Sequence, residues 1–119
     1  MGKKILLADD EVGIRTSLTD ILEGRGYEVI HAANGQEAIE KARRENPDLV
    51  LLDTMMPGIG GIEACRQIKQ VEKLPCKVIV YTGNIDAIDA VEARRCGADD
   101  YCVKGTDPSL LIGTVEKIL

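Results

Sequence analysis

A few acids, one threonine and one lysine stand where short apolar runs of the chain end. Asp9 and Asp10 follow the first run, Asp53 ends the stretch DLVLLD, and Thr82 and Lys104 close two later runs. An uninterrupted apolar run bounded by turn residues is typical of a strand covered on both faces of a parallel sheet. Ligands of open parallel sheets bind beyond the carboxyl ends of the strands. The sequence therefore predicts that these polar side chains gather at one edge of a sheet.

If the first and third strands are neighbours in the sheet, three carboxylates converge, and they repel one another unless a cation neutralises them. The acids contribute three negative charges and Lys104 one positive charge, so a divalent ion brings the site to about neutral. Mg²⁺ prefers oxygen ligands, keeps several waters and is held by one or two carboxylates together with phosphate oxygens. The pattern thus predicts a Mg²⁺ site, which Mn²⁺ could also occupy, suited to phosphate chemistry.

Asp53 is the predicted nucleophile, because a carboxylate can attack phosphorus and form an aspartyl phosphate. Lys104 and the metal would spread the charge of the equatorial oxygens, which is most of what phosphoryl transfer requires. Simpler explanations exist for each residue alone. Asp10 could belong to the acidic first turn of a helix, Asp53 could cap the next segment, and Lys104 could be a solvated surface charge. The ordered occurrence of these residues at the ends of strands one, three, four and five favours the chemical interpretation.

The elements that must hold these residues alternate strictly between strand and helix. Predicted strands are KILLA (4–8), YEVIHA (27–32), DLVLL (48–52), KVIVY (77–81) and DYCV (100–103). Helical spacing connects two apolar sets in the segments between and after the strands: Ile14, Leu18, Ile21 and Leu22, and then Leu111, Val115, Ile118 and Leu119. Five such units predict an α/β fold, a parallel sheet with helices on both faces.

Capping residues and glycines mark where the helices begin and end. Asn34 followed by Glu37 predicts a capping box, and Asp107 before Pro108 predicts a cap and a first-turn proline. Glycines in EGRGY and RCGAD are placed where helices end. No linker, repeat or low-complexity tract interrupts residues 1–119, so we expect one domain.

Composition limits the classes of partner and the cellular compartment that we expect for the protein. The chain is 45% hydrophobic with a net charge of -5, and its Lys and Arg residues form no basic run, which argues against a nucleic-acid surface. The N-terminal apolar stretch is too short for a signal peptide or a membrane span, so we expect a cytoplasmic protein without membrane contact. The four cysteines form no C-x-x-C pair, and we expect reduced and mostly buried thiols.

The motifs LLADDE, DTMMPGIGG, VYTG and GADDYCVK resemble those of the receiver domains of bacterial two-component response regulators, chemotaxis-regulator-like proteins among them. They span nearly the whole chain. The resemblance implies a flavodoxin-like, doubly wound, five-stranded parallel sheet of order 2-1-3-4-5 with five helices. It also implies a signalling switch: Asp53 would accept a phosphoryl group from the phosphohistidine of a sensor kinase or phosphotransfer protein.

The resemblance assigns the metal ligands. Asp10 would bind Mg²⁺ directly and Asp9 mainly through water, with Asp53 and the backbone carbonyl of Met55 as further ligands. It implies a phosphoacceptor that catalyses only its own phosphorylation and slow dephosphorylation.

The resemblance also assigns the switch. The Thr82 hydroxyl and Lys104 would each contact a phosphoryl oxygen, and the ring of Tyr101 would turn inward when Thr82 moves. The face made by the fourth helix, fifth strand and fifth helix would then change shape for a downstream effector protein or domain.

Three departures from the family pattern involve four positions. Gly105 follows Lys104 where proline in a cis peptide is usual, and a cis bond without proline costs roughly 2.5–4 kcal/mol, so we expect a trans peptide there. Gly60 replaces an acid that would cap the third helix. Met55 and Asn84 occupy two positions that tune phosphate lifetime in the family.

Other functions fit the residues less well. A phosphatase of the haloacid dehalogenase type needs a second aspartate where Met55 stands, and a flavin-binding protein needs a phosphate loop where ADDEVG stands. A degenerate scaffold is excluded because every chemical position is filled.

The receiver could stand alone, or be part of a multidomain transcriptional regulator whose effector domain is absent. The last helix, DPSLLIGTVEKIL, has no arginine, which favours a monomer or a weak, phosphorylation-dependent dimer.

Overall fold

A computed structural model of the chain describes residues 2–82, 87–103 and 108–119, and for residues 82 and 87–90 it describes the backbone alone. The centre of the fold is a five-stranded parallel sheet of order β2-β1-β3-β4-β5. The strands are β1 (Lys4–Ala8), β2 (Glu28–Ala32), β3 (Leu49–Asp53), β4 (Lys77–Thr82) and β5 (Asp100–Val103). This is the predicted 2-1-3-4-5 order, and the strand bounds differ from the predicted ones by a single residue at most.

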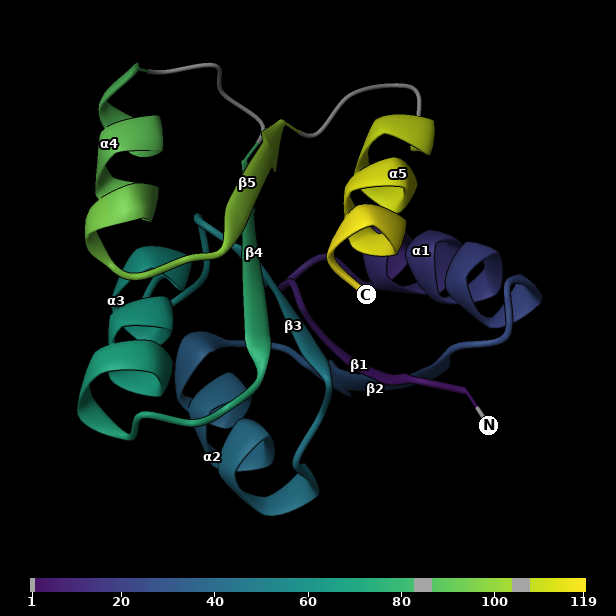
Figure 1. Ribbon diagram of the computed structural model, residues 1–119, viewed down its shortest axis with the longest axis horizontal. Helices are drawn as coiled ribbons and strands as arrows, with labels where there is room; N and C mark the ends of the chain where they lie inside the picture. The colour runs from purple at the N-terminus through teal and green to yellow at the C-terminus, as the bar shows by residue number, and fades with distance from the viewer. Residues whose placement is uncertain (1, 83–86, 104–107) are drawn as a thin grey trace.

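Helices cover both faces of the sheet (Figure 1). They are α1 (Val12–Gly24), α2 (Gly35–Glu45), α3 (Gly61–Arg66), α4 (Ala87–Arg95) and α5 (Ser109–Ile118). One core lies between the sheet and α2, α3 and α4, and the other lies between the sheet and α1 and α5. The predicted apolar sets of the first and last helices, at 14–22 and 111–119, both pack into the second core. A π-helical segment, η1 (Gln67–Val71), continues α3 and was not predicted.

The position of β3 at the centre of the sheet explains why residues 49–52 are all apolar. All five residues of β3 are buried, because β1 and β4 flank the strand and helices cover it above and below. Its last residue, Asp53, therefore leaves the core at the edge where the neighbouring strands also end.

The predicted Asn34 cap and the glycines lie at helix ends, but α5 begins at Ser109, so Pro108 precedes the helix and is not in its first turn. The Asn34 carboxamide oxygen accepts the Glu37 N–H at 2.8 Å, and the Glu37 carboxylate accepts the Ala33 N–H at 3.1 Å. Gly26 and Gly97 follow α1 and α4 with φ of 94° and 91°, which glycine adopts without steric cost. The predicted cap Asp107 lies outside the described residues.

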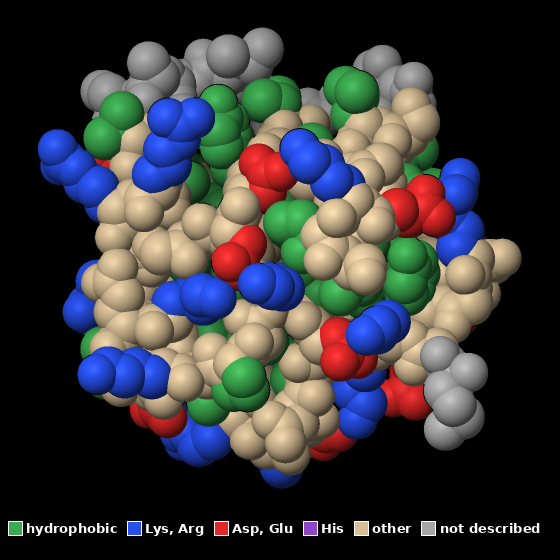
Figure 2. Space-filling model, viewed as in Figure 1, with side chains coloured by type: hydrophobic (Ala, Val, Ile, Leu, Met, Phe, Trp, Pro, Cys, Tyr) green, Lys and Arg blue, Asp and Glu red, His purple; other side chains and the backbone are tan. Residues whose placement is uncertain are grey.

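Three cysteines are buried and Cys102 is half-buried, and all four are free thiols, as predicted. Lys and Arg side chains are interspersed with Asp and Glu on the face shown in Figure 2. Within the described ranges, no helix combines the length and apolar character needed to cross a membrane.

Candidate functional site

The predicted acids meet at the carboxyl edge of the sheet. One carboxylate oxygen each from Asp9, Asp10 and Asp53 lies within 4.8 Å of the others. The strand register explains this, because Ala8 on β1 pairs with Leu52 on β3 and the next residue of each strand is an aspartate. Among the described residues this is the one group of three or more acids, cysteines or histidines close enough to share a metal ion.

The two strand-end aspartates differ sharply from Asp10 in their surroundings. Asp9 is 0% exposed and Asp53 is 2% exposed, whereas Asp10 is exposed. Side chains alternate along a strand, so Asp9 shares a face with Leu7, and Asp53 shares a face with Leu51. Both leucines belong to the core beneath α1 and α5. The two buried acids therefore lie at the end of that core, next to the exposed Asp10.

Hydrogen bonds hold the Asp9 carboxylate in place. One oxygen accepts the Glu11 N–H at 2.9 Å and the other accepts the Tyr81 hydroxyl at 2.8 Å. The Arg15 guanidinium, from the first turns of α1, donates to the backbone carbonyl of Asp9. The two hydrogen bonds to the carboxylate, from the Glu11 N–H and the Tyr81 hydroxyl, stabilise its charged form.

Tyr81 was not predicted to be part of the site. Burial and the neighbouring Asp9 carboxylate raise the pKa of the Tyr81 phenol, so it is a neutral donor at ordinary pH. The one signal in the sequence is that Tyr81 is a hydroxyl-bearing ring in the otherwise aliphatic run VIV, directly before Thr82.

Asp53 and the loop after it fit closely against their surroundings. The Met55 N–H donates to the Asp53 carboxylate at 3.2 Å, and the Thr54 N–H donates to the Tyr81 carbonyl at 3.0 Å. A Cβ on Gly61 would lie 2.1 Å from the carbonyl oxygen of Asp53. The glycine that opens α3 thus allows the helix to approach the phosphoacceptor candidate. Gly60 before it makes no side-chain cap, in line with the expectation for that position.

The remaining predicted residues are described only in part. Thr82 ends β4, one residue beyond the pairing of Asp53 with Tyr81, but the description covers its backbone only. Lys104, Gly105 and Asn84 lie outside the described residues, so the predicted trans peptide after Lys104 stays a prediction.

The donor set fits a hard divalent cation. Three carboxylates within 4.8 Å offer oxygen ligands and three formal negative charges, which suits Mg²⁺ far better than a thiophilic metal. Asp9, Asp10 and Asp53 would hold such an ion. The ligand role of the Met55 carbonyl stays a prediction, while the Met55 side chain is 76% exposed.

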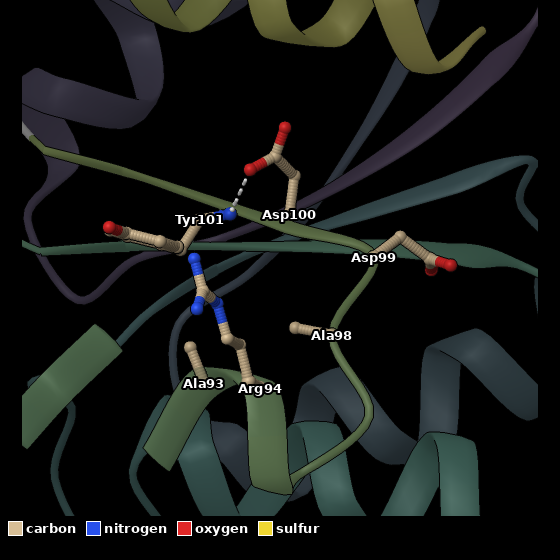
Figure 3. A pocket seen from close by; sticks show the side chains of 6 residues that line it. All are labelled: Ala93, Arg94, Ala98, Asp99, Asp100 and Tyr101. Atoms are coloured by element: carbon tan, nitrogen blue, oxygen red, sulfur yellow. Dashed lines mark hydrogen bonds between the residues drawn. The ribbon is translucent and has the colours of Figure 1, made fainter. Parts of the chain in front are cut away.

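Tyr101 lies on β5, which β4 separates from the strand that carries Asp53. Its side chain is 37% exposed. With Arg94, Asp99 and Asp100 it borders a cavity of about 230 Å³, which Ala93 and Ala98 also line. Figure 3 shows the Arg94 side chain extending from α4 toward the strand that carries Tyr101. Because Tyr101 is 37% exposed, an inward movement of its ring would lower that exposure measurably.

Comparison with known proteins agrees with the fold. A family model described as a response regulator receiver domain matches residues 5–116. The alkaline phosphatase synthesis transcriptional regulatory protein PhoP of Bacillus subtilis is 44% identical over 119 residues, which are 100% of this chain and 49% of that protein. The chain therefore spans about half the length of this curated relative.

Two solved structures show the same architecture. The response regulator TrrA of Thermotoga maritima, in complex with Mg²⁺ and beryllium fluoride, superposes with a TM-score of 0.89 at 38% identity, covering 98% of this chain and 99% of that one. The chemotaxis protein CheY4 of Vibrio cholerae superposes with a TM-score of 0.91 at 29% identity, covering 100% of both chains.

Proposed function

The chain belongs to the family of response regulator receiver domains, and from this premise we propose that Asp53 accepts a phosphoryl group in a Mg²⁺-dependent reaction. The observation that supports this most is the convergence of the buried Asp53 carboxylate with Asp9 and Asp10 within 4.8 Å. The donor would be a phosphohistidine of a sensor histidine kinase or phosphotransfer protein.

In the proposed reaction, a carboxylate oxygen of Asp53 attacks phosphorus. The new P–O bond forms as the P–N bond to the donor imidazole breaks, and the nitrogen takes the electron pair of the broken bond. Mg²⁺, when bound, supplies positive charge against the phosphoryl oxygens. The protein's part is to hold the acids in place before the donor arrives: the Met55 N–H fixes Asp53, and the Glu11 N–H and Tyr81 hydroxyl fix Asp9. Prearranged groups of this kind need no reorganisation during transfer.

We propose that the phosphoryl group then acts on the switch residues. It adds about -1.5 to -2 charge and three acceptor oxygens, which favour any conformation that brings Thr82 and Lys104 closer. Tyr101 would then turn inward on β5. Each of the three elements has an exposed apolar residue, Val91 on α4, Tyr101 on β5 and Leu110 on α5, and we propose that their face binds a protein partner.

The finer points of the function are proposals as well. We propose a downstream effector protein or domain as the partner of the α4–β5–α5 face, and a monomer or weak phosphorylation-dependent dimer. We propose a phosphoacceptor rather than a multiple-turnover enzyme, without direct contact to nucleic acid or membrane. The compartment we propose is the cytoplasm, where ATP supplies phosphate to kinases.

The proposal is tested with Mg²⁺ and acetyl phosphate, followed by intact mass measurement. We expect one added phosphoryl group on the parent protein and on Asp20→Asn, which removes an exposed carboxylate on α1 outside the site. We expect none on Asp53→Asn, and none when a chelator removes the metal. Labelling of Asp53→Asn, or labelling without metal, would contradict the assignment.

A further inference from the structure

Tyr81 reaches across the sheet to the acidic site. Its strand, β4, is separated from β1 by β3, yet its hydroxyl lies 2.8 Å from an oxygen of Asp9 just beyond β1. The ring is 1% exposed and packs in the core beneath α1 and α5, with Leu51 and Ile79. Packing fixes the ring, and the fixed ring therefore determines where its hydroxyl lies.

Two donors from different parts of the chain restrain Asp9. The Glu11 N–H fixes one carboxylate oxygen from the loop before α1, and Tyr81 fixes the other from β4. A carboxylate held at both oxygens has a defined plane. Asp10 and Asp53 each have a carboxylate oxygen within 4.8 Å of one from Asp9, so a cation held by the three acids would contact this oriented carboxylate.

The backbone of Tyr81 is tied to the same site. Its carbonyl accepts the Thr54 N–H at 3.0 Å, and its strand position pairs with Asp53. One residue therefore connects the loop that carries Asp9, the strand that carries Asp53 and the strand that ends in Thr82. An aliphatic residue at this position could make the backbone contact but could not bind Asp9.

We propose that Tyr81 is a positioning residue of the metal site, which sets the affinity for a divalent cation by orienting Asp9. Carboxylates that bind metals are commonly oriented by hydrogen bonds of this kind, and loss of such a bond typically lowers affinity 10–100-fold. The inference rests on the metal site of the proposed function but not on phosphoryl transfer to Asp53.

The test is Tyr81→Phe, which removes one hydroxyl and keeps the ring. Mn²⁺ binding is measured from the electron paramagnetic resonance signal of the free ion, with circular dichroism to confirm the folded fraction. We expect the Mn²⁺ dissociation constant to rise about tenfold or more. Tyr27→Phe is the matched control, because Tyr27 packs at the edge of the same core and is outside the acidic site. We expect its affinity to equal that of the parent.

A second measurement keeps the test decisive if Tyr81→Phe does not fold. In the parent protein labelled at its tyrosine rings, Mg²⁺ should shift the NMR signals of Tyr81 and leave those of Tyr27 in place.

An affinity of folded Tyr81→Phe within twofold of the parent would overturn the proposal. Tighter binding would overturn it as well, because it would mean that the hydroxyl competes with the metal. Unshifted Tyr81 signals at saturating Mg²⁺ would overturn it too. Failed phosphorylation with normal Mn²⁺ behaviour would count against the role of Asp53 alone.

Discussion

The carboxylates of Asp9 and Asp53 lie within 4.8 Å of each other at the ends of neighbouring strands, and both side chains are buried. Burial and like charge each disfavour two ionised acids at this distance. Donated hydrogen bonds from Glu11, Met55 and Tyr81 offset part of that cost. The arrangement costs stability in the metal-free protein, and a bound cation would recover it.

Removal of one charge from the site should therefore stabilise the metal-free protein. When a chelator has removed the metal, we expect Asp10→Asn to raise the free energy of unfolding by up to about 1 kcal/mol. The increase is small because Asp10 is exposed and its charge is screened by solvent and salt. The same variant should lose most of the rise in Tm that Mg²⁺ gives the parent, since a ligand stabilises only through its affinity for the folded state. Thermal unfolding with and without Mg²⁺ measures both effects. The control Asp20→Asn should keep the full Mg²⁺ response, and an equal response in Asp10→Asn would refute the ligand role.

Gly61 should tolerate no side chain. A Cβ there would lie 2.1 Å from the carbonyl oxygen and 2.7 Å from the carbonyl carbon of Asp53, which are backbone atoms that cannot rotate away. We expect Gly61→Ala to lower the free energy of unfolding by about 1–3 kcal/mol and to slow phosphorylation by moving Asp53. Urea unfolding and the acetyl phosphate assay measure these changes.

Gly113 provides the control for that substitution. It lies inside α5 with open space around its position, so Gly113→Ala should raise stability by about 0.5–1 kcal/mol. Equal effects of the two substitutions would show that the contact between Gly61 and Asp53 is not the cause.

The fold and the acids of the site were predictable because each depends on short-range patterns. The apolar run at 49–52 predicts a strand buried on both faces, and parallel strands bring their carboxyl ends to one edge. That reasoning places Asp9, Asp10 and Asp53 together once the first and third strands are neighbours, as in the 2-1-3-4-5 order, and the structure confirms both the pairing and the convergence.

The contacts that sequence reasoning missed depend on distances across the fold. Whether the Tyr81 hydroxyl reaches Asp9 depends on ring length, strand spacing and core packing, and none of these is visible in the run KVIVYT. The close approach of Gly61 to Asp53 and the π-helical segment after α3 likewise follow from packing. The roles of Thr82 and Lys104 stay predictions.

His31 should make stability depend on pH. It is the single histidine of the sequence, half-buried on β2, and burial followed by the charges of Arg15 and Lys41 lowers its pKa from 6.5. Below pH 6.5 the unfolded chain therefore binds more protons at this site than the folded protein does. The contribution of His31 to stability is complete above 6.5 and declines as the pH falls toward the folded pKa.

The measurement is an NMR titration of the His31 ring together with urea unfolding at several pH values. We expect the titration midpoint below 6.5, and we expect His31→Gln to lose less stability than the parent between pH 7.5 and the folded pKa. Since the carboxylates titrate in both proteins, the difference between the two curves isolates His31. A midpoint at or above 6.5 would contradict the prediction.

Tyr101 should become less exposed when the site holds a phosphoryl mimic. With Mg²⁺ and beryllofluoride, we expect the exposed fraction of its side chain to fall from 37%, because drawing Thr82 toward the mimic would free space on the inner side of β5. Fluorine NMR of fluorotyrosine-labelled protein with a soluble paramagnetic agent measures this, since the agent broadens exposed rings most. Asp53→Asn is the control, and its Tyr101 signal should not respond to beryllofluoride. A parent signal that also stays unchanged, while the Asp53 site is shown to be saturated, would contradict the predicted role of Tyr101 in the switch.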